Sequence, residues 1–182
     1  TETLAALRTA QVAIDRDLIE ARRLQQGLIG ERQAQFGDFI VSNLLSPAGH
    51  VGGDLTGNFA INARRFGVFA IDVSGHGVAA ALLTARLATQ FSASVDQNAA
   101  LFINEFGLYD ARPPAVLARY LNHLMLADLR IDTYFTLIYA VIDQQSGEVQ
   151  IVQAGHPHPV VQRANGQIEL VGNGGLPVGV VE

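Results

Sequence analysis

Two acidic residues in glycine-rich surroundings constrain the fold of this chain more than any other feature of its sequence. Asp54 ends the segment Val-Gly-Gly-Asp, and Asp72 begins the segment Asp-Val-Ser-Gly-His-Gly. Between them, two apolar runs at 59–61 and 66–71 flank a polar break at 62–65, which is the pattern of a β-hairpin. A turn centred in that break would place the two acids directly opposite each other on neighbouring strands.

Two carboxylates that face each other across a strand pair need a cation or a shared proton between them. Directly opposed side chains lie about 4.5–5.5 Å apart at Cβ, where like charges repel. Hard divalent cations bind oxygen ligands, often one or two carboxylates together with water. The pair therefore predicts part of a metal site on rigid strands, with glycines leaving space around it. Gly-Gly-Asp is also common in solvated turns, so the spacing alone leaves that alternative open.

In this order and with this separation, the two acidic segments resemble the bacterial metal-dependent serine phosphatases of the PP2C-like (PPM) superfamily. The nearer subgroup is the sporulation and stress-response branch that dephosphorylates anti-anti-sigma factors. The resemblance runs from about Glu20 to the last residue. Further segments resemble helices and central strands of these domains, namely 20–28, 79–83, 112–122, 134–137 and 154–157.

The resemblance implies roles for individual residues. Asp54 is expected to bridge two metal ions, and Asp72 to bind one of them together with the backbone carbonyl of Val73. The two acids are therefore the expected catalytic residues, with Mn²⁺ or Mg²⁺ as the cofactor. Gly75 and His76, which follow directly, are weaker candidates for contacting the substrate.

The sequence departs from the family pattern in two places. Family members often carry a second acid three residues after the first, where this chain has Gly57. That difference puts accessory metal contacts or water orientation in doubt. The family's remaining metal-binding acids lie in a Thr-Asp-Gly segment and in a later Asp, and Glu182 precedes both. The phosphatase domain is therefore expected to be incomplete at its C-terminus and to hold only part of a two-metal site.

Other residues near these motifs have more ordinary explanations. Ser74 is expected to cap the following helix, because a serine nucleophile needs a base and an orienting acid that sequence neighbours rarely provide. His156 and His158 flank a proline, where packing at a strand end is favoured over metal binding. His50 and His123 are expected to be surface or packing residues.

The rest of the chain predicts an α+β fold. Strand-like segments are followed by helices at about 78–92 and 113–129, and strands resume at residue 134. The stretch 94–110 is ambiguous. This order fits an α-β-β-α sandwich of antiparallel sheets over residues 36–182, incomplete at its C-terminus.

Residues 1–30 are expected to form a separate helical linker. A parallel two-stranded coiled coil is favoured over a single amphipathic helix that lies on its own domain. The resemblance implies an upstream receiver or sensor domain, so that the phosphatase would be the output domain of a response regulator and a homodimer. The heptad seam alternates steps of three and four residues through Leu4, Leu7, Gln11, Ile14, Leu18, Ala21, Gln25 and Leu28.

Composition excludes several classes of protein. A chain of 182 residues that is 49% hydrophobic and 16% charged is globular and suits one domain with an appended element. The net charge is −5 and the basic residues form no dense cluster, which argues against nucleic acid. The absence of cysteine excludes disulfides, zinc–thiolate sites and thiol nucleophiles. With no signal peptide and no run long enough to span a bilayer, we expect a cytoplasmic protein without membrane contact.

Sequence and resemblance together predict a metal-dependent serine/threonine phosphatase. Its expected substrate is a phosphorylated anti-anti-sigma protein of the STAS type in a partner-switching pathway. The alternative is a catalytically incomplete pseudo-phosphatase that binds a phosphoprotein or mediates dimerisation, as Gly57 and the missing acids suggest. A third possibility is a different metallohydrolase that uses the two acids and His76.

Overall fold

The structure is a computed structural model that describes residues 2–27, 32–46, 51–92, 97–129 and 132–181. His50 and Leu28, for which the sequence predicts a surface role and a seam position, lie outside these residues.

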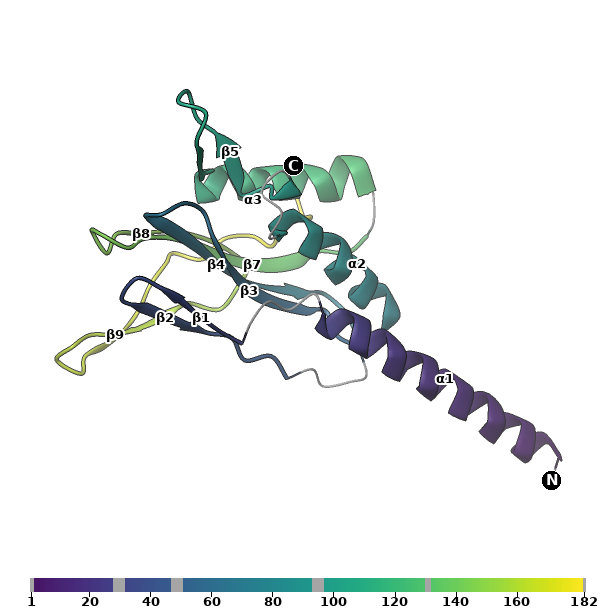
Figure 1. Cartoon of the computed structure of the whole chain (residues 1–182). Coiled ribbons are helices and arrows are strands. Elements are labelled where there is room, and N and C mark those ends of the chain that lie inside the picture. The colour runs from purple at the N-terminus through teal and green to yellow at the C-terminus, as the bar shows by residue number, and fades with distance from the viewer. Residues whose placement is uncertain (1, 28–31, 47–50, 93–96, 130–131, 182) are drawn as a thin grey trace.

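A four-stranded antiparallel sheet forms the centre of the molecule, in the order β3–β4–β7–β8 (Figure 1). The predicted hairpin is confirmed as β3 and β4, and Asn62 shapes its turn by accepting hydrogen bonds from the backbone N–H groups of Arg64 and Arg65. The four strands are β3 (Asp54–Ala60), β4 (Arg65–Val73), β7 (Phe135–Asp143) and β8 (Val149–Ala154).

Two helices cover one face of this sheet. The Ala- and Leu-rich α2 (Val78–Ala88) continues as a single 3₁₀ turn, Thr89–Phe91. Helix α3 (Pro114–His123) starts with a proline and continues as a π-helical stretch, Leu124–Leu129. Both helices share one hydrophobic core with the sheet, so they lie on the same side of it. This core includes Leu55, Phe59, Ile71, Leu83, Leu87, Leu117, Leu121, Phe135, Leu137 and Tyr139.

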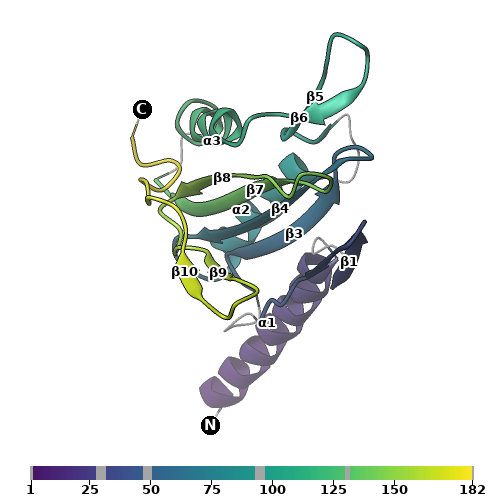
Figure 2. The ribbon, with the colours of Figure 1, turned by 90° about the vertical axis from the view of Figure 1, so that its left-hand side faces the viewer.

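Two small hairpins lie on the opposite face. They are β1 (Gln33–Phe36) with β2 (Phe39–Ser42), and β9 (Val160–Gln162) with β10 (Ile168–Leu170). Figure 2 shows β9 and β10 across the central sheet from α3. The rings of Phe36 and Phe66 stack with their centroids 4.4 Å apart and fasten the first hairpin to the sheet. Helices on one face and antiparallel strands on the other confirm the predicted α+β class.

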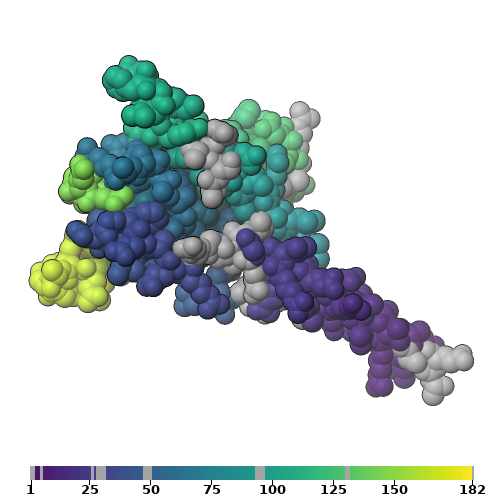
Figure 3. All heavy atoms as spheres, viewed as in Figure 1, coloured from purple at the N-terminus to yellow at the C-terminus, as the bar shows by residue number. Residues whose placement is uncertain are grey.

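Three elements differ from the expected boundaries. Strand β1 begins at Gln33, before the predicted start of the domain at residue 36. The ambiguous stretch contains a third hairpin, β5 (Leu101–Ile103) with β6 (Tyr109–Ala111). This hairpin stands out from the body of the molecule (Figure 3). Its strands are only three residues long, too short for sequence periodicity to identify.

The N-terminal helix α1 (Glu2–Gln26) points away from the sheet (Figures 1 and 3). Its seam residues Leu4, Leu7 and Ile14 are 62%, 66% and 53% exposed, so nothing in the described chain covers their apolar side chains. No helix within the described ranges combines the length and apolar character that crossing a membrane requires.

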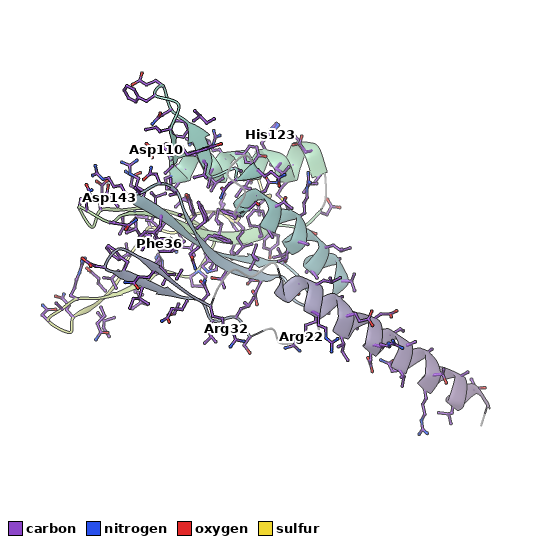
Figure 4. All side chains as sticks on the ribbon, in the orientation of Figure 1. Arg22, Arg32, Phe36, Asp110, His123 and Asp143 are labelled. Atoms are coloured by element: carbon purple, nitrogen blue, oxygen red, sulfur yellow. The ribbon has the colours of Figure 1, made fainter. Side chains whose placement is uncertain are left out.

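Asp143 ties the two turns at one end of the sheet together. Its carboxylate accepts hydrogen bonds from the backbone N–H groups of Ser146 and Gln145 and forms an ion pair with Arg64. These interactions lower its pKa to about 2. Arg65 lies 3.7 Å from Asp143 and 2.8 Å from Asp110, which anchors the β5–β6 hairpin at the same end (Figure 4).

We predict that Asp143→Asn lowers the melting temperature at pH 7. Because the folded-state pKa lies below the ordinary value of 3.8, the stabilisation is present above that value and is lost as pH falls toward 2. Calorimetry between pH 7 and 2 should show the gap between wild type and variant closing. The exposed Asp38→Asn is the matched control, and an equal loss in both variants would contradict this role for Asp143.

Candidate functional site

The structure places Asp54 and Asp72 directly opposite each other. They form a cross-strand pair at the start of β3 and near the end of β4, and Asp72 is in turn paired with Thr136 of β7. Side chains alternate between the faces of a strand. Since the neighbours Leu55 and Ile71 point into the helix-covered core, the row of Asp54, Asp72 and Thr136 lies on the other face.

Gly53 lets the first acidic segment lie tightly against the end of β4. Its carbonyl accepts the N–H of Val73 at 3.1 Å and lies 2.9 Å from the hydroxyl of Thr84 on α2. A Cβ atom on Gly53 would stand 2.7 Å from the carbonyl oxygen of Val73. The glycine is therefore required for the carbonyl of Val73, the predicted third oxygen ligand, to lie beside this segment.

The two carboxylates change each other's ionisation. Partial burial raises the pKa of Asp54, and the negative charge of Asp72 and a hydrogen bond between the two carboxyl groups raise it further. His156 acts in the opposite direction. Carboxylates this close repel each other unless a proton or a cation lies between them.

His156 lies beside the acids, which its position in the sequence did not indicate. Its Nδ1 is 2.8 Å from Oγ1 of Thr136, the third member of the row. Burial lowers the pKa of His156, while the charges of Asp72 and Asp54 raise it. The β7–β8 hairpin was predicted, but continuing its register would set Thr136 opposite Gly155 and not His156, so strand pairing carried no signal for this contact.

The predicted role of Ser74 as a helix cap is wrong. Helix α2 is preceded by Gly77 and has no side-chain cap. The hydroxyl oxygen of Ser74 instead accepts the backbone N–H of Tyr134 at 3.2 Å, and so joins the end of β4 to the start of β7. Gly75, with φ of 90°, and the exposed His76 form the connection from β4 to α2.

Three other positions fall outside the acid pair. His158 lies 3.2 Å from the carbonyl oxygen of Val171 through Nδ1, and His123 is on α3, on the far face of the sheet (Figure 4). Gly57 is buried, and a Cβ there would stand 2.8 Å from the ring of Phe69. An acid could not occupy that position in this packing.

Sequence patterns also missed a contact between α1 and the acidic segment. The side-chain amide of Gln25 donates to the carbonyl of Gly52 at 2.6 Å and accepts the N–H of Gly52 at 3.1 Å. This double hydrogen bond holds the end of α1 two residues away from Asp54.

The acids fit one side of a divalent cation site. Two carboxylates and a nearby backbone carbonyl are the hard oxygen donors that Mg²⁺ and Mn²⁺ prefer. Over the described ranges, no three His, Asp or Glu side chains gather closely enough to hold a metal ion. Any cation bound here would need further ligands from water, substrate or other residues.

Comparisons with known proteins agree on one family. Residues 62–182 match the family of Stage II sporulation protein E (SpoIIE). The chain is 29% identical over 167 residues to the phosphoserine phosphatase RsbP of Bacillus subtilis strain 168. That alignment covers 92% of this chain and 39% of RsbP.

Solved structures show the same fold. The SiaA-PP2C domain of Pseudomonas aeruginosa superimposes with a TM-score of 0.71 at 19% identity, covering 93% of this chain and 64% of that one. The RsbU and RsbW domains of Rv1364c from Mycobacterium tuberculosis give a TM-score of 0.50 at 26% identity, covering 74% and 34%. The chain thus spans less than two thirds of the length of each of these relatives.

We predict that Asp54→Asn stabilises the metal-free protein at pH 7. Ionisation of a carboxyl whose folded-state pKa is raised costs stability as pH rises through that pKa. Removing a like charge that lies directly opposite another should therefore gain about 0.2–1 kcal/mol. The gain should vanish below about pH 3.8, the ordinary pKa, where both states are protonated.

Denaturant unfolding with a chelator present measures this gain, with the exposed Asp17→Asn as control. With excess Mn²⁺ the order should reverse, because only wild type is stabilised by binding. A variant that is less stable than wild type without metal would show that the acids are not in repulsion.

Proposed function

The chain belongs to the SpoIIE family, and from this membership we propose that it is a metal-dependent protein phosphatase that hydrolyses phosphoserine or phosphothreonine side chains. The observation that carries the proposal is the in-register pair of Asp54 and Asp72 on the face of the sheet opposite the helices. RsbP, which aligns with 92% of the chain, is itself named a phosphoserine phosphatase.

In this proposal the acids hold Mn²⁺ or Mg²⁺, with the backbone carbonyl of Val73 as a further ligand. Bound cations of this kind lower the pKa of a water molecule to near neutrality and offset charge on the phosphoryl oxygens. A bound cation would offset the repulsion between the carboxylates of Asp54 and Asp72. Gly75 and His76 line the approach of the substrate. The in-line attack on phosphorus by water requires no phosphorylated enzyme side chain.

The proposed substrate is a phosphorylated anti-anti-sigma protein of the STAS type. This part of the proposal rests on the likeness to the branch of the superfamily that acts on such proteins. Dephosphorylation would free the anti-anti-sigma protein to bind its anti-sigma factor, which is the switch in a partner-switching pathway.

We further propose that residues 1–30 form a dimeric coiled coil that carries a signal from an upstream receiver or sensor domain. The exposed apolar side chains of α1 support dimerisation through this helix. The hydrogen bonds between Gln25 and Gly52 offer a direct physical route from the helix to Asp54.

A pseudo-phosphatase remains the second candidate, because only two carboxylates meet at the site within the described residues. Such a protein would bind a phosphorylated partner without turnover.

Phosphate release tests the main proposal. The protein, at the full length in which it is encoded, should release phosphate from a phosphoserine STAS protein only with Mn²⁺ or Mg²⁺. Asp54→Asn and Asp72→Asn should each lower the rate by about 10²-fold or more, since both hold the cations, while Asp17→Asn should not. Phosphoprotein binding without turnover in wild type would instead favour the pseudo-phosphatase.

Gln25 and Gln11 provide a matched test of the proposed coupling from α1 through Gly52 to Asp54. Both occupy seam positions, but the side chain of Gln11 donates to Asp15 of its own helix and not to the acidic segment. Gln25→Ala should cost about 0.5–1.5 kcal/mol of stability per hydrogen bond lost and weaken Mn²⁺ binding, whereas Gln11→Ala should do neither. Equal effects on dimerisation, with no change in Mn²⁺ affinity for either variant, would refute the route through Gly52.

A further inference from the structure

The pair formed by Thr136 and His156 has no part in the cation site proposed above, yet it adjoins that site. Thr136 is the neighbour of Asp72 in the cross-strand row, and its hydroxyl meets Nδ1 of His156 at 2.8 Å. The acids and Thr136 come from three adjacent strands, and His156 follows the fourth strand, β8. The imidazole thus extends the row by one side chain.

The backbone that carries His156 is fixed by its own contacts. The side chain of Gln153, only 8% exposed, donates to the carbonyl of His156 at 2.6 Å and accepts the N–H of Gly174 at 2.9 Å. Gly155 has φ of 65°, and a Cβ there would stand 2.6 Å from the ring of Pro177. A turn held this tightly defines the direction in which the imidazole leaves the backbone.

The chemistry of the ring limits what it can do. The contact with Thr136 occupies Nδ1, which leaves Nε2 as the available ring nitrogen. Partial burial lowers the pKa of His156, which favours the neutral ring. A neutral imidazole whose Nδ1 accepts the threonine O–H carries its own hydrogen on Nε2 and is a donor there.

A direct role as a metal ligand is less well supported. The acid pair and His156 all lie in the described chain, and no three-membered cluster able to hold a metal ion occurs there. A hydrogen-bond donor that lies beside a cation site, without being a ligand of the cations, can bind the anion that the cations attract. In a phosphatase that anion is the phosphoryl group.

We propose that Nε2–H of His156 donates a hydrogen bond to a phosphoryl oxygen of the substrate, and that Thr136 positions the ring by donating its hydroxyl hydrogen to Nδ1. His156 is then a substrate-contacting residue and Thr136 a positioning residue. This inference rests on the proposed function, since it presupposes a phosphoryl group above the acid pair.

Binding measurements on the full-length protein test the inference without turnover. Inorganic phosphate is titrated calorimetrically into the Mn²⁺-loaded protein, and Mn²⁺ affinity is measured separately from the paramagnetic resonance of the free ion. His156→Phe keeps a ring but removes the donor, so phosphate affinity should fall by about tenfold or more. Mn²⁺ affinity should stay within about threefold, because the ligands are intact.

Thr136 supplies a second, milder pair of variants. Thr136→Val removes the hydroxyl at nearly constant volume and should weaken phosphate binding, while Thr136→Ser should restore it. His158→Phe, two residues from His156, is the control and should change neither affinity. Should His156→Phe fail to fold, the Val and Ser variants still decide the question.

Each other result overturns the inference. A large loss of Mn²⁺ affinity in His156→Phe would make His156 a metal ligand. Unchanged phosphate and Mn²⁺ affinities in both His156→Phe and Thr136→Val would make the pair a packing contact, with the proposed function intact. Wild type that binds no Mn²⁺ would refute the proposed function and this inference together.

Discussion

The register of β4 between β3 and β7 is the constraint on which the rest of the structure depends. Strand β4 pairs along its whole length with β7 and along most of it with β3. Shifting a strand by one residue would turn every side chain to the opposite face. Such a shift would bury Asp72 against the helices and expose Ile71. Burial of Ile71 and Val73 under α2 and α3 therefore holds the carboxylates on the face opposite the helices.

The same register makes the acid pair locally destabilising. Two carboxylates that directly oppose each other destabilise a sheet, and partial burial adds to the cost by raising the pKa of Asp54. Structures break local rules of stability mainly where function requires it. The hydrophobic core offsets this cost elsewhere, and a bound cation would turn repulsion into attraction.

The segment from Val51 to Gly53 connects most of the elements that matter to the site. Gly52 bonds to Gln25 of α1, while the carbonyl of Gly53 meets Thr84 of α2 and the N–H of Val73 in β4. Asp54 follows directly. Any movement of α1 relative to the sheet would therefore act first on the backbone next to Asp54. This geometry supports the proposal that a signal from α1 reaches the acid pair through Gly52.

Local patterns determined much of this protein. Apolar alternation around a short polar break predicted the hairpin that opposes Asp54 and Asp72, and the helices after Gly77 and Pro113 follow from composition and proline placement. These features depend on residues close in sequence, where strand and helix periods set the geometry.

The three-residue strands β5 and β6 are too short to carry a period, and Ser74 does not cap α2 because its hydroxyl accepts the N–H of Tyr134 instead. Only the tertiary structure decided that His156 joins the row through Thr136 and that Gln25 holds Gly52, because both contacts link segments at least 20 residues apart. Contacts of that kind follow from how the packed layers meet, which no local periodicity encodes.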